Sequence, residues 1–187
     1  MRFTSFFLAV ISVTLLVSCG QKMSDDEAKK IILQYMKYPE PVFNITHAGP
    51  AGSPDIPKFV KGAEKLASEG YLTEDAEKSG GSQKNRVYKP TERTRNYVTG
   101  VYVGESFALY DGALCNEVLK KIGSVQVDKE GGTAIISYVT GYEPIEPFYS
   151  LLCINDYCAY FGDKLKKEEA RLIKVKKYGK GWRISPA

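Results

Sequence analysis

The residues of this sequence that are best able to do chemistry are four cysteines and a single histidine. Thiolates and imidazole bind zinc, but the spacing of Cys115, Cys153 and Cys158 lacks the paired C-x₂-C pattern of such sites. His47 lies in a segment rich in proline and glycine, where we expect a surface loop. The sequence therefore indicates neither a metal site nor another cofactor.

The sequence contains few candidates for catalysis. A hydrolytic triad needs a histidine beside a nucleophile and a carboxylate, and the sequence has no Gly-x-Ser-x-Gly motif. Glu143 and Glu146 lie on either side of Pro144, as a carboxylate pair of the kind that hydrolyses glycosidic bonds. Because charged residues around a proline turn are more often solvated, we expect a non-enzymatic protein and assign no catalytic residue.

The N-terminus has the features of an export signal. Residues 6–17 form an apolar run of 12 residues, shorter than the roughly 20 that span a bilayer as a helix. The next segment, Leu16-Val17-Ser18-Cys19-Gly20, resembles the lipobox of bacterial lipoproteins. The resemblance implies cleavage after residue 18, lipidation of the Cys19 thiol and anchoring in a membrane by two or more acyl chains. By resemblance to the sorting rules of Gram-negative lipoproteins, Gly20 in place of Asp implies the outer membrane and not the inner one.

Export places the remaining cysteines in an oxidising compartment. With Cys19 lipidated, three cysteines remain, so at most one internal disulfide forms. Cys153 and Cys158 would close a short loop, whereas Cys115 with either of them would close a longer one. The sequence leaves these pairings open.

The segment after the anchor carries helix signals. Ser24 and Glu27 match a capping box, and apolar residues then recur at helical spacing as far as the prolines at 39 and 41. We expect residues 39–54 to form a loop, and a second helix to start near Ser53 or Asp55 and to end before Gly70, where glycine suits the C′ position. The apolar stripes are Ala28, Ile31, Ile32, Tyr35 and Met36 in the first helix, and Phe59, Ala63, Leu66 and Ala67 in the second.

Residues 25–97 resemble a winged-helix domain. In that family a helix ends at a glycine, an apolar pair begins the first wing strand, and the second strand runs into a tight turn. Gly70, Tyr71-Leu72 and the run Val87-Tyr88-Lys89-Pro90-Thr91-Glu92 follow this pattern, although Pro90 and Thr94 stand where leucine and glycine are usual. Since export separates the chain from DNA, the resemblance implies a protein-docking module, and we expect no nucleic-acid partner.

From about residue 98 the apolar periodicity changes to two, which predicts strands. We expect a strand from Val101 to Leu109, a turn at Asp111-Gly112 and a short helix over residues 113–122. Two hairpins follow, one over residues 125–142 and one over residues 171–184. The predicted class is α+β: after a signal peptide (1–18) and a tether (19–23) come a small helical, winged-helix-like domain (24–97) and an antiparallel β domain with a short helix (98–187).

Residues 163–183 carry nine basic and three acidic residues, a local charge of +6, whereas the whole chain carries +4. On a strand, Lys174 and Lys176 point away from the face that holds Ile173 and Val175. Such a surface suits anionic head groups, lipopolysaccharide or an acidic partner, although lysines also protect solvated strands from pairing. The candidate binding residues are Lys174, Lys176 and Lys177 together with Tyr142, Tyr149, Tyr157 and Tyr160 of an aromatic segment.

The composition is that of an ordinary globular protein, and its net charge is too small for a dedicated nucleic-acid binder. We therefore expect a lipid-anchored protein of the bacterial envelope that binds another envelope component, in the first place a protein, through its C-terminal domain. The alternatives are an inhibitor or modulator of a periplasmic hydrolase, acting through a Cys153–Cys158 loop, and a hydrolase of cell-wall glycans.

Overall fold

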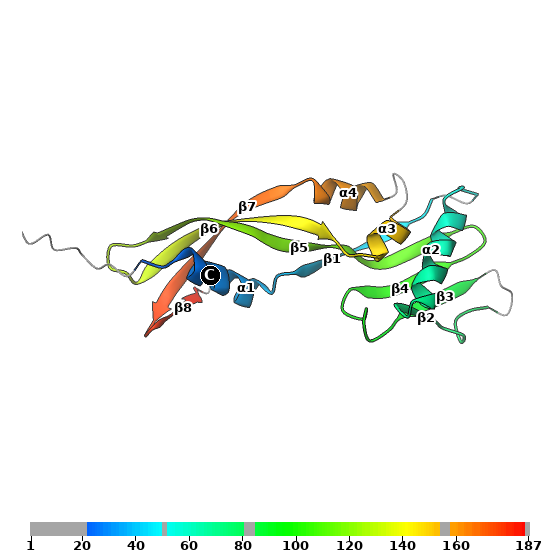
Figure 1. The fold of residues 1–187 in the computed structure, drawn as a ribbon, viewed down its shortest axis with the longest axis horizontal. Coiled ribbons are helices and arrows are strands. Elements are labelled where there is room, and N and C mark those ends of the chain that lie inside the picture. Colours follow the sequence, from blue (N-terminus) through cyan, green and yellow to red (C-terminus); the bar gives the residue numbers. More distant parts are fainter. Residues whose placement is uncertain (1–21, 50–51, 81–84, 154–157, 186–187) are drawn as a thin grey trace, which may run out of the picture.

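The computed structural model describes residues 22–49, 52–80, 85–153 and 158–185. In this part of the chain eight antiparallel strands form one sheet, and four short helices pack on it, so the α+β class is confirmed (Figure 1). The helices are α1 (Asp25–Met36), α2 (Ile56–Ser68), α3 (Phe148–Leu152) and α4 (Ala159–Leu165). The strands are β1 (Glu40–His47), β2 (Leu72–Glu74), β3 (Arg86–Pro90), β4 (Val98–Val103), β5 (Ala108–Val127), β6 (Thr133–Pro144), β7 (Glu168–Tyr178) and β8 (Gly181–Ile184).

The long strand β5 connects the two ends of the sheet. The strand order is β2-β3-β4-β5-β6-β7-β8, and β1 pairs with β5 outside this path. Residues 115–117 of β5 pair with both β1 and β6, so these two strands lie on opposite edges of β5. Residues 109–112 pair with both β1 and β4, which places β4 on the same edge as β6. One edge of β5 is thus shared in succession by β4 and β6.

The predicted helix over residues 113–122 and the predicted turn at Asp111-Gly112 are wrong, because both lie inside β5. The pairing with β6 is irregular between Leu119 and Lys121 and again between Ile122 and Ser124. Each irregularity adds a residue to β5 and resets the alternation of side chains. Leu119, Ile122 and Val125 consequently pack on the same side, three residues apart, although the backbone is extended. In the sequence this spacing imitates a helix.

Two hydrophobic cores lie along the sheet. The first, which we call the α1 core, is built from Met23, Ala28, Ile31, Ile32, Tyr38, Ala134, Ile136, Tyr138 and Val175. The second, the α2 core, contains Phe59, Ala63, Leu66, Tyr110, Leu114, Cys115, Tyr142, Phe148, Leu152 and Phe161 among others. Figure 1 shows α1 near β8 at one end of the molecule and α2 beside β2–β4 at the other.

The predicted start of α1 is confirmed. Ser24 caps the helix: its hydroxyl accepts a hydrogen bond from the Glu27 N–H (3.2 Å), and the Glu27 carboxylate accepts one from the Ser24 N–H (3.1 Å). The helix ends at Lys37, whose φ of 56° is left-handed. Ala28, Ile31 and Ile32 face the α1 core, whereas Tyr35 is 40% exposed.

The winged-helix resemblance of residues 25–97 is not confirmed. Some of its parts are present, since α2 is followed by Gly70 at φ +75° and then by the β2–β3 hairpin. However, α1 belongs to the α1 core and α2 to the other core. Strands β2 and β3 continue through β4 into β5, so the sheet extends across the predicted domain boundary at residue 97. The division into two domains there stays a prediction.

The predicted loop at residues 39–54 is wrong over Glu40–His47, which form β1. Prolines favour a loop in sequence, but proline is tolerated on an edge strand because its missing N–H can face away from the sheet. Pro41 lies on such a strand, since β1 pairs with β5 alone among the described strands. His47 accordingly ends a strand opposite Leu109 and does not lie in a loop.

Both predicted late hairpins are confirmed. Strands β5 and β6 are joined at residues 128–132, where the Asp128 carboxylate accepts a hydrogen bond from the Gly132 N–H at 2.8 Å. Strands β7 and β8 are joined around Gly179, whose φ of +58° suits glycine. These turns depend on local sequence and were therefore readable from it.

Charged and phenolic groups meet where the two cores adjoin. Arg171 Nη2 lies 2.7 Å from the Glu117 carboxylate and 3.2 Å from Glu169, and Glu117 is buried. The Tyr142 hydroxyl donates to Glu169 (3.2 Å) and accepts from Lys164 (3.3 Å). Burial, with the nearby Glu117 charge second, raises the pKa of Tyr38, whose hydroxyl accepts from Arg171. This cluster ties β5, β6, β7 and α4 together.

We expect replacement of Arg171 by leucine to lower the free energy of unfolding by about 2 kcal/mol. Breaking a fully buried ion pair costs about 3–5 kcal/mol, because a charge is left buried without a partner. The Arg171 side chain is 35% exposed, which reduces that cost. The measurement is urea denaturation of the Cys19→Ser protein.

Two further variants control for general damage. The double variant Glu117→Leu/Arg171→Leu should be more stable than Arg171→Leu alone, because it removes the stranded carboxylate. Glu169→Gln removes a more exposed partner of Arg171 and should change stability by less than about 0.5 kcal/mol. A loss of less than about 0.5 kcal/mol for Arg171→Leu would contradict the role given to this pair.

Candidate functional site

The face of β6 and β7 turned away from α1 carries two of the three predicted lysines, Lys174 and Lys176. Strand β7 alternates: Arg171, Ile173 and Val175 are partly or fully buried, whereas Leu172, Lys174 and Lys176 are exposed. The predicted separation of Lys174 and Lys176 from Ile173 and Val175 is confirmed. We call the residues that point to this side of the sheet the lysine face: the partly buried Thr133 and Ser137 and the exposed Ile135 of β6, and the exposed Leu172, Lys174 and Lys176 of β7.

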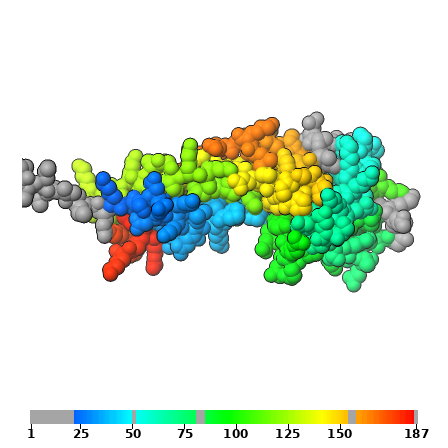
Figure 2. Space-filling model, in the orientation of Figure 1, coloured from blue at the N-terminus to red at the C-terminus, as the bar shows by residue number. Residues whose placement is uncertain are grey.

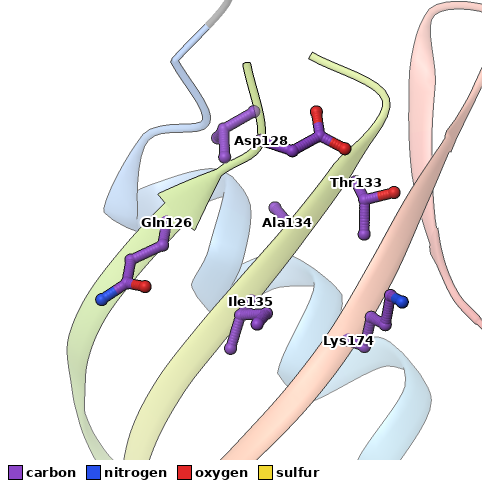
Figure 3. Close-up of a pocket in the computed structure, with 7 residues that line it drawn as sticks. Gln126, Asp128, Thr133, Ala134, Ile135 and Lys174 are labelled. Atoms are coloured by element: carbon purple, nitrogen blue, oxygen red, sulfur yellow. The ribbon is translucent and has the colours of Figure 1, made fainter. Parts of the chain in front are cut away.

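The register of β6 and β7 places two apolar side chains beside Lys174, whereas Lys176 lies opposite Thr133. Ile135 lies opposite Lys174, and Leu172, which is 74% exposed, lies two residues before it. A shallow depression of about 380 Å³ opens next to them, lined by Gln126, Val127, Asp128, Thr133, Ala134, Ile135 and Lys174. Figure 3 shows Ile135 and Lys174 on neighbouring strands, with Asp128 and Thr133 nearer the hairpin end.

Sequence reasoning missed Ile135 and Leu172 as members of this surface. A signal was present in both strands, since Ile135-Ile136 and Leu172-Ile173 are adjacent apolar pairs. In a strand, adjacent side chains point to opposite faces, so one member of each pair must leave the core. The structure shows which one: Ile136 is buried, while Ile135 is 44% exposed.

Lys177 does not share the surface of the other two lysines. It follows Lys176 on β7, so its side chain points to the opposite face, where its Nζ lies 5.8 Å from the centre of the Trp182 ring. The three predicted lysines are therefore divided between two faces of one strand. This division makes Lys177 unsuitable as a member of a single docking surface with Lys174 and Lys176.

The predicted tyrosines are also dispersed. Tyr142 is only 6% exposed and belongs to the α2 core, and Tyr149 is partly buried against that core. Tyr160 is 46% exposed, stacks edge-to-face on Phe161 with ring centres 5.3 Å apart, and lies under the Lys164 ammonium. Tyr157 lies outside the described residues. The aromatic segment thus contributes more to the core than to the surface.

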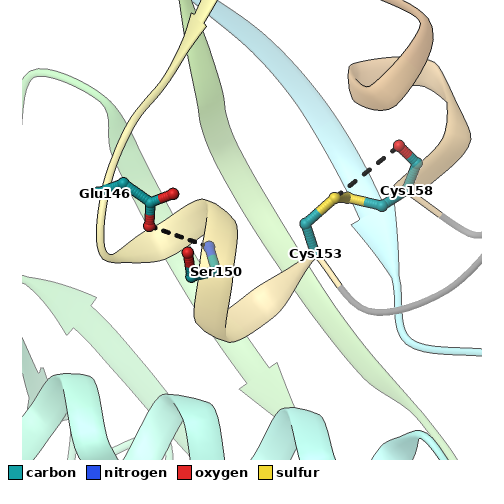
Figure 4. The surroundings of a disulfide bond; sticks show 4 residues. All are labelled: Glu146, Ser150, Cys153 and Cys158. Carbon is teal, nitrogen blue, oxygen red and sulfur yellow. Dashed lines mark hydrogen bonds between the residues drawn. A yellow bond between two sulfur atoms is a disulfide. The ribbon is translucent and has the colours of Figure 1, made fainter. Parts of the chain in front are cut away.

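The cysteine pairing left open by the sequence is resolved in favour of the short loop. Cys153 and Cys158 form a disulfide, which links the end of α3 to the start of α4 (Figure 4). Cys115 is buried as a free thiol in the α2 core, and burial raises its pKa to about 11. Cys19, the predicted lipidation site, lies outside the described residues.

The groups considered for catalysis have structural partners. Glu143 forms an ion pair with Lys120 at 2.9 Å, and the Glu146 carboxylate accepts a hydrogen bond from the Ser150 N–H of α3 (Figure 4). In the part of the chain that the structure describes, no group of three or more His, Cys, Asp or Glu side chains is arranged to hold a metal ion. No helix among these described residues has the length and apolarity needed to cross a membrane.

Thiol titration of the Cys19→Ser protein tests the pairing. In denaturant without reductant we expect one reactive thiol, from Cys115, and after reduction three. In the native protein the reaction should be slow, because burial restricts access and because little thiolate exists well below a pKa of about 11. Its rate should rise with pH, without a plateau below about pH 10. Three free thiols in denaturant without reductant would contradict the disulfide.

Comparison with known proteins adds no relative: no protein family, no curated protein and no solved structure matches this chain. Evidence for a function therefore comes from the chain's own surface and from its N-terminal export signal, because a class of fold does not specify an activity.

Proposed function

We propose that this chain is a non-enzymatic lipoprotein of the bacterial envelope, anchored through Cys19, most simply in the outer membrane, which binds another envelope protein through the lysine face of its C-terminal sheet. The observation that carries the proposal is Leu172, a large apolar side chain that is 74% exposed next to Lys174. Single exposed apolar residues are common, but here Ile135 lies on the adjoining strand with a depression beside it.

The surface supports a partner with acidic side chains around an apolar group. Lys174 and Lys176 form the polar rim of such an interface, where charge steers association and selects partners. Leu172 and Ile135 supply the apolar contact at its centre. The Asp128 carboxylate, which also borders the depression, accepts a hydrogen bond from the Gly132 N–H of its own turn.

The short tether bears on where this surface would lie. Three residues, 20–22, separate Cys19 from Met23, which makes four residue-to-residue steps, and Met23 is buried in the α1 core. An extended chain spans at most about 3.6 Å per residue, so the α1 core would stay within about 14 Å of the lipid-bearing residue. The lysine face belongs to the strands that build this core, so the partner would be met close to the membrane surface.

Affinity capture from solubilised envelope tests the proposal. The bait is the lipid-free protein with Cys19→Ser, and the test variants are Lys174→Glu/Lys176→Glu and Leu172→Ser. We expect a captured envelope protein whose amount falls at least about tenfold with either test variant, because each removes one chemical component of the surface.

The matched control is Lys30→Glu/Lys89→Glu, which makes the same change of charge at exposed lysines of α1 and β3. This control should capture as much partner as the unchanged bait, and capture by the test variants should differ from it at every salt concentration used. If the test and control variants lost capture of the partner equally, the effect would come from net charge alone and the proposal would be overturned. Capture unaffected by all variants, or no capture at all, would overturn the proposal.

A further inference from the structure

Strand β1 has an open edge that no described strand occupies. Among the described residues β1 pairs with β5 and with no other strand. No described helix packs against β1 as extensively as β5 does. The N–H of Ala48, the residue after β1, donates to the carbonyl of Ala108, the first residue of β5, at 3.0 Å. Because the direction of backbone groups alternates along a strand, the N–H groups of Phe43, Ile45 and His47 point away from β5.

A side-chain hydrogen bond agrees with this direction. The Ile45 N–H donates to the Asn44 side-chain oxygen at 2.9 Å, so a neighbouring amide satisfies a group that no strand reaches. Pro41, two residues before Phe43, also directs its backbone away from β5. Because proline has no N–H, it offers only a carbonyl to the open edge. The edge therefore presents a ladder of donors and acceptors that one further strand can complete.

The side chains of β1 add an apolar surface to this edge. Phe43 is 53% exposed and Ile45 is 55% exposed, two positions apart on one face, with exposed His47 next to them. Natural proteins protect open edges with charges, prolines or covering segments. Here Glu40 and Pro41 protect one end of β1, while its centre carries an aromatic and a β-branched side chain.

The surroundings of the edge favour a single extended segment over a second copy of this chain. In Figure 2 the outline is indented where β1 (light blue) lies, between the end that holds α1 and β8 and the end that holds β2–β4. Two copies paired symmetrically through β1 would each bring both ends toward the other copy. A single strand is narrower than a second folded copy, so it needs less room at this indentation.

We propose that the open edge of β1 binds an extended segment of a partner protein as an added antiparallel strand, with apolar side chains at alternate positions against Phe43 and Ile45. Backbone hydrogen bonds to Phe43, Ile45 and His47 provide affinity, and the alternate side chains provide selectivity. A segment of about five or six residues covers the strand. On binding, the Asn44 amide gives up the Ile45 N–H to the incoming carbonyl. This site differs from the lysine face and does not require it.

The test uses a panel of synthetic eight-residue peptides with Val, Ile or Phe at alternate positions and Thr or Lys between them. Binding to the Cys19→Ser protein is followed by amide hydrogen exchange. We expect the best peptides to slow exchange at Phe43, Ile45 and His47 at least about tenfold, and to leave Thr46, whose N–H points toward β5, unchanged. The same peptides with N-methyl groups on the pairing amides should not bind.

Two variants separate strand addition from adhesion to an apolar surface. Ile45→Pro removes one outward N–H and should weaken peptide binding at least about tenfold, while Phe43→Ser should change which side chains are preferred. Lys174→Glu/Lys176→Glu should leave peptide binding unchanged, so failure here and failure of the lysine face are distinguishable. If Ile45→Pro fails to fold, the N-methyl peptides still decide the question.

Three outcomes would overturn the proposal. One is that no peptide protects the three amides. A second is that N-methylated peptides bind as well as the unmodified ones. The third is that the protein itself dimerises with rising concentration in sedimentation and protects the same amides, which would make a second copy the occupant.

Discussion

The arrangement of the whole molecule depends on β5 being one continuous strand. Twenty residues of extended chain reach about 65 Å, which is several times the length of an ordinary strand. No single core can cover that length, so the chain builds one core around α1 and another around α2. Where the cores adjoin, the buried Glu117 carboxylate needs a cation, and Arg171 of β7 provides it. The ion pair between Glu117 and Arg171 thus joins β5 to β7 at the point where β5 passes from one core to the other.

A sheet of this length with four short helices leaves surfaces uncovered. Helix α1 lies against one face of the C-terminal strands, and the lysine face is the opposite one. Strand β1 pairs with one edge of β5, and no described strand pairs with the other edge of β1. The two proposed binding surfaces are therefore consequences of the same architecture. They differ in chemistry, since the lysine face offers charge around exposed leucine and isoleucine, and the β1 edge offers backbone hydrogen bonds.

The aromatic residues show how burial redistributes candidates for function. Phe148 is fully buried and is surrounded by Tyr71, Tyr97 and Tyr110, with ring centres 5.4 to 6.0 Å away. Tyrosine suits this role because its hydroxyl can reach a polar group while its ring packs, as the Tyr110 hydroxyl does by donating to the Ala113 carbonyl at 2.8 Å. An abundance of tyrosine in the sequence here reflects the core first and the surface second.

Features governed by neighbours in sequence were determined by the sequence alone. The capping box at Ser24, the glycine after α2, both late hairpins and the alternation around Lys174 follow from interactions within a few residues. Two of the six residues of the lysine face, namely its lysines, were therefore predictable. The cysteine arithmetic likewise limited the protein to one internal disulfide.

The remaining features were decided by contacts between distant segments. Pairing with β1 and β6 keeps residues 113–122 extended despite helical spacing, and pairing with β5 makes a strand of residues that contain proline. Which isoleucine of the pair 135–136 faces solvent depends on register, and register depends on the bulges and on the partner strand. The burial of Tyr142 in the α2 core has the same origin. A sequence shows which residues alternate, but only the packed sheet decides which side of that alternation meets water.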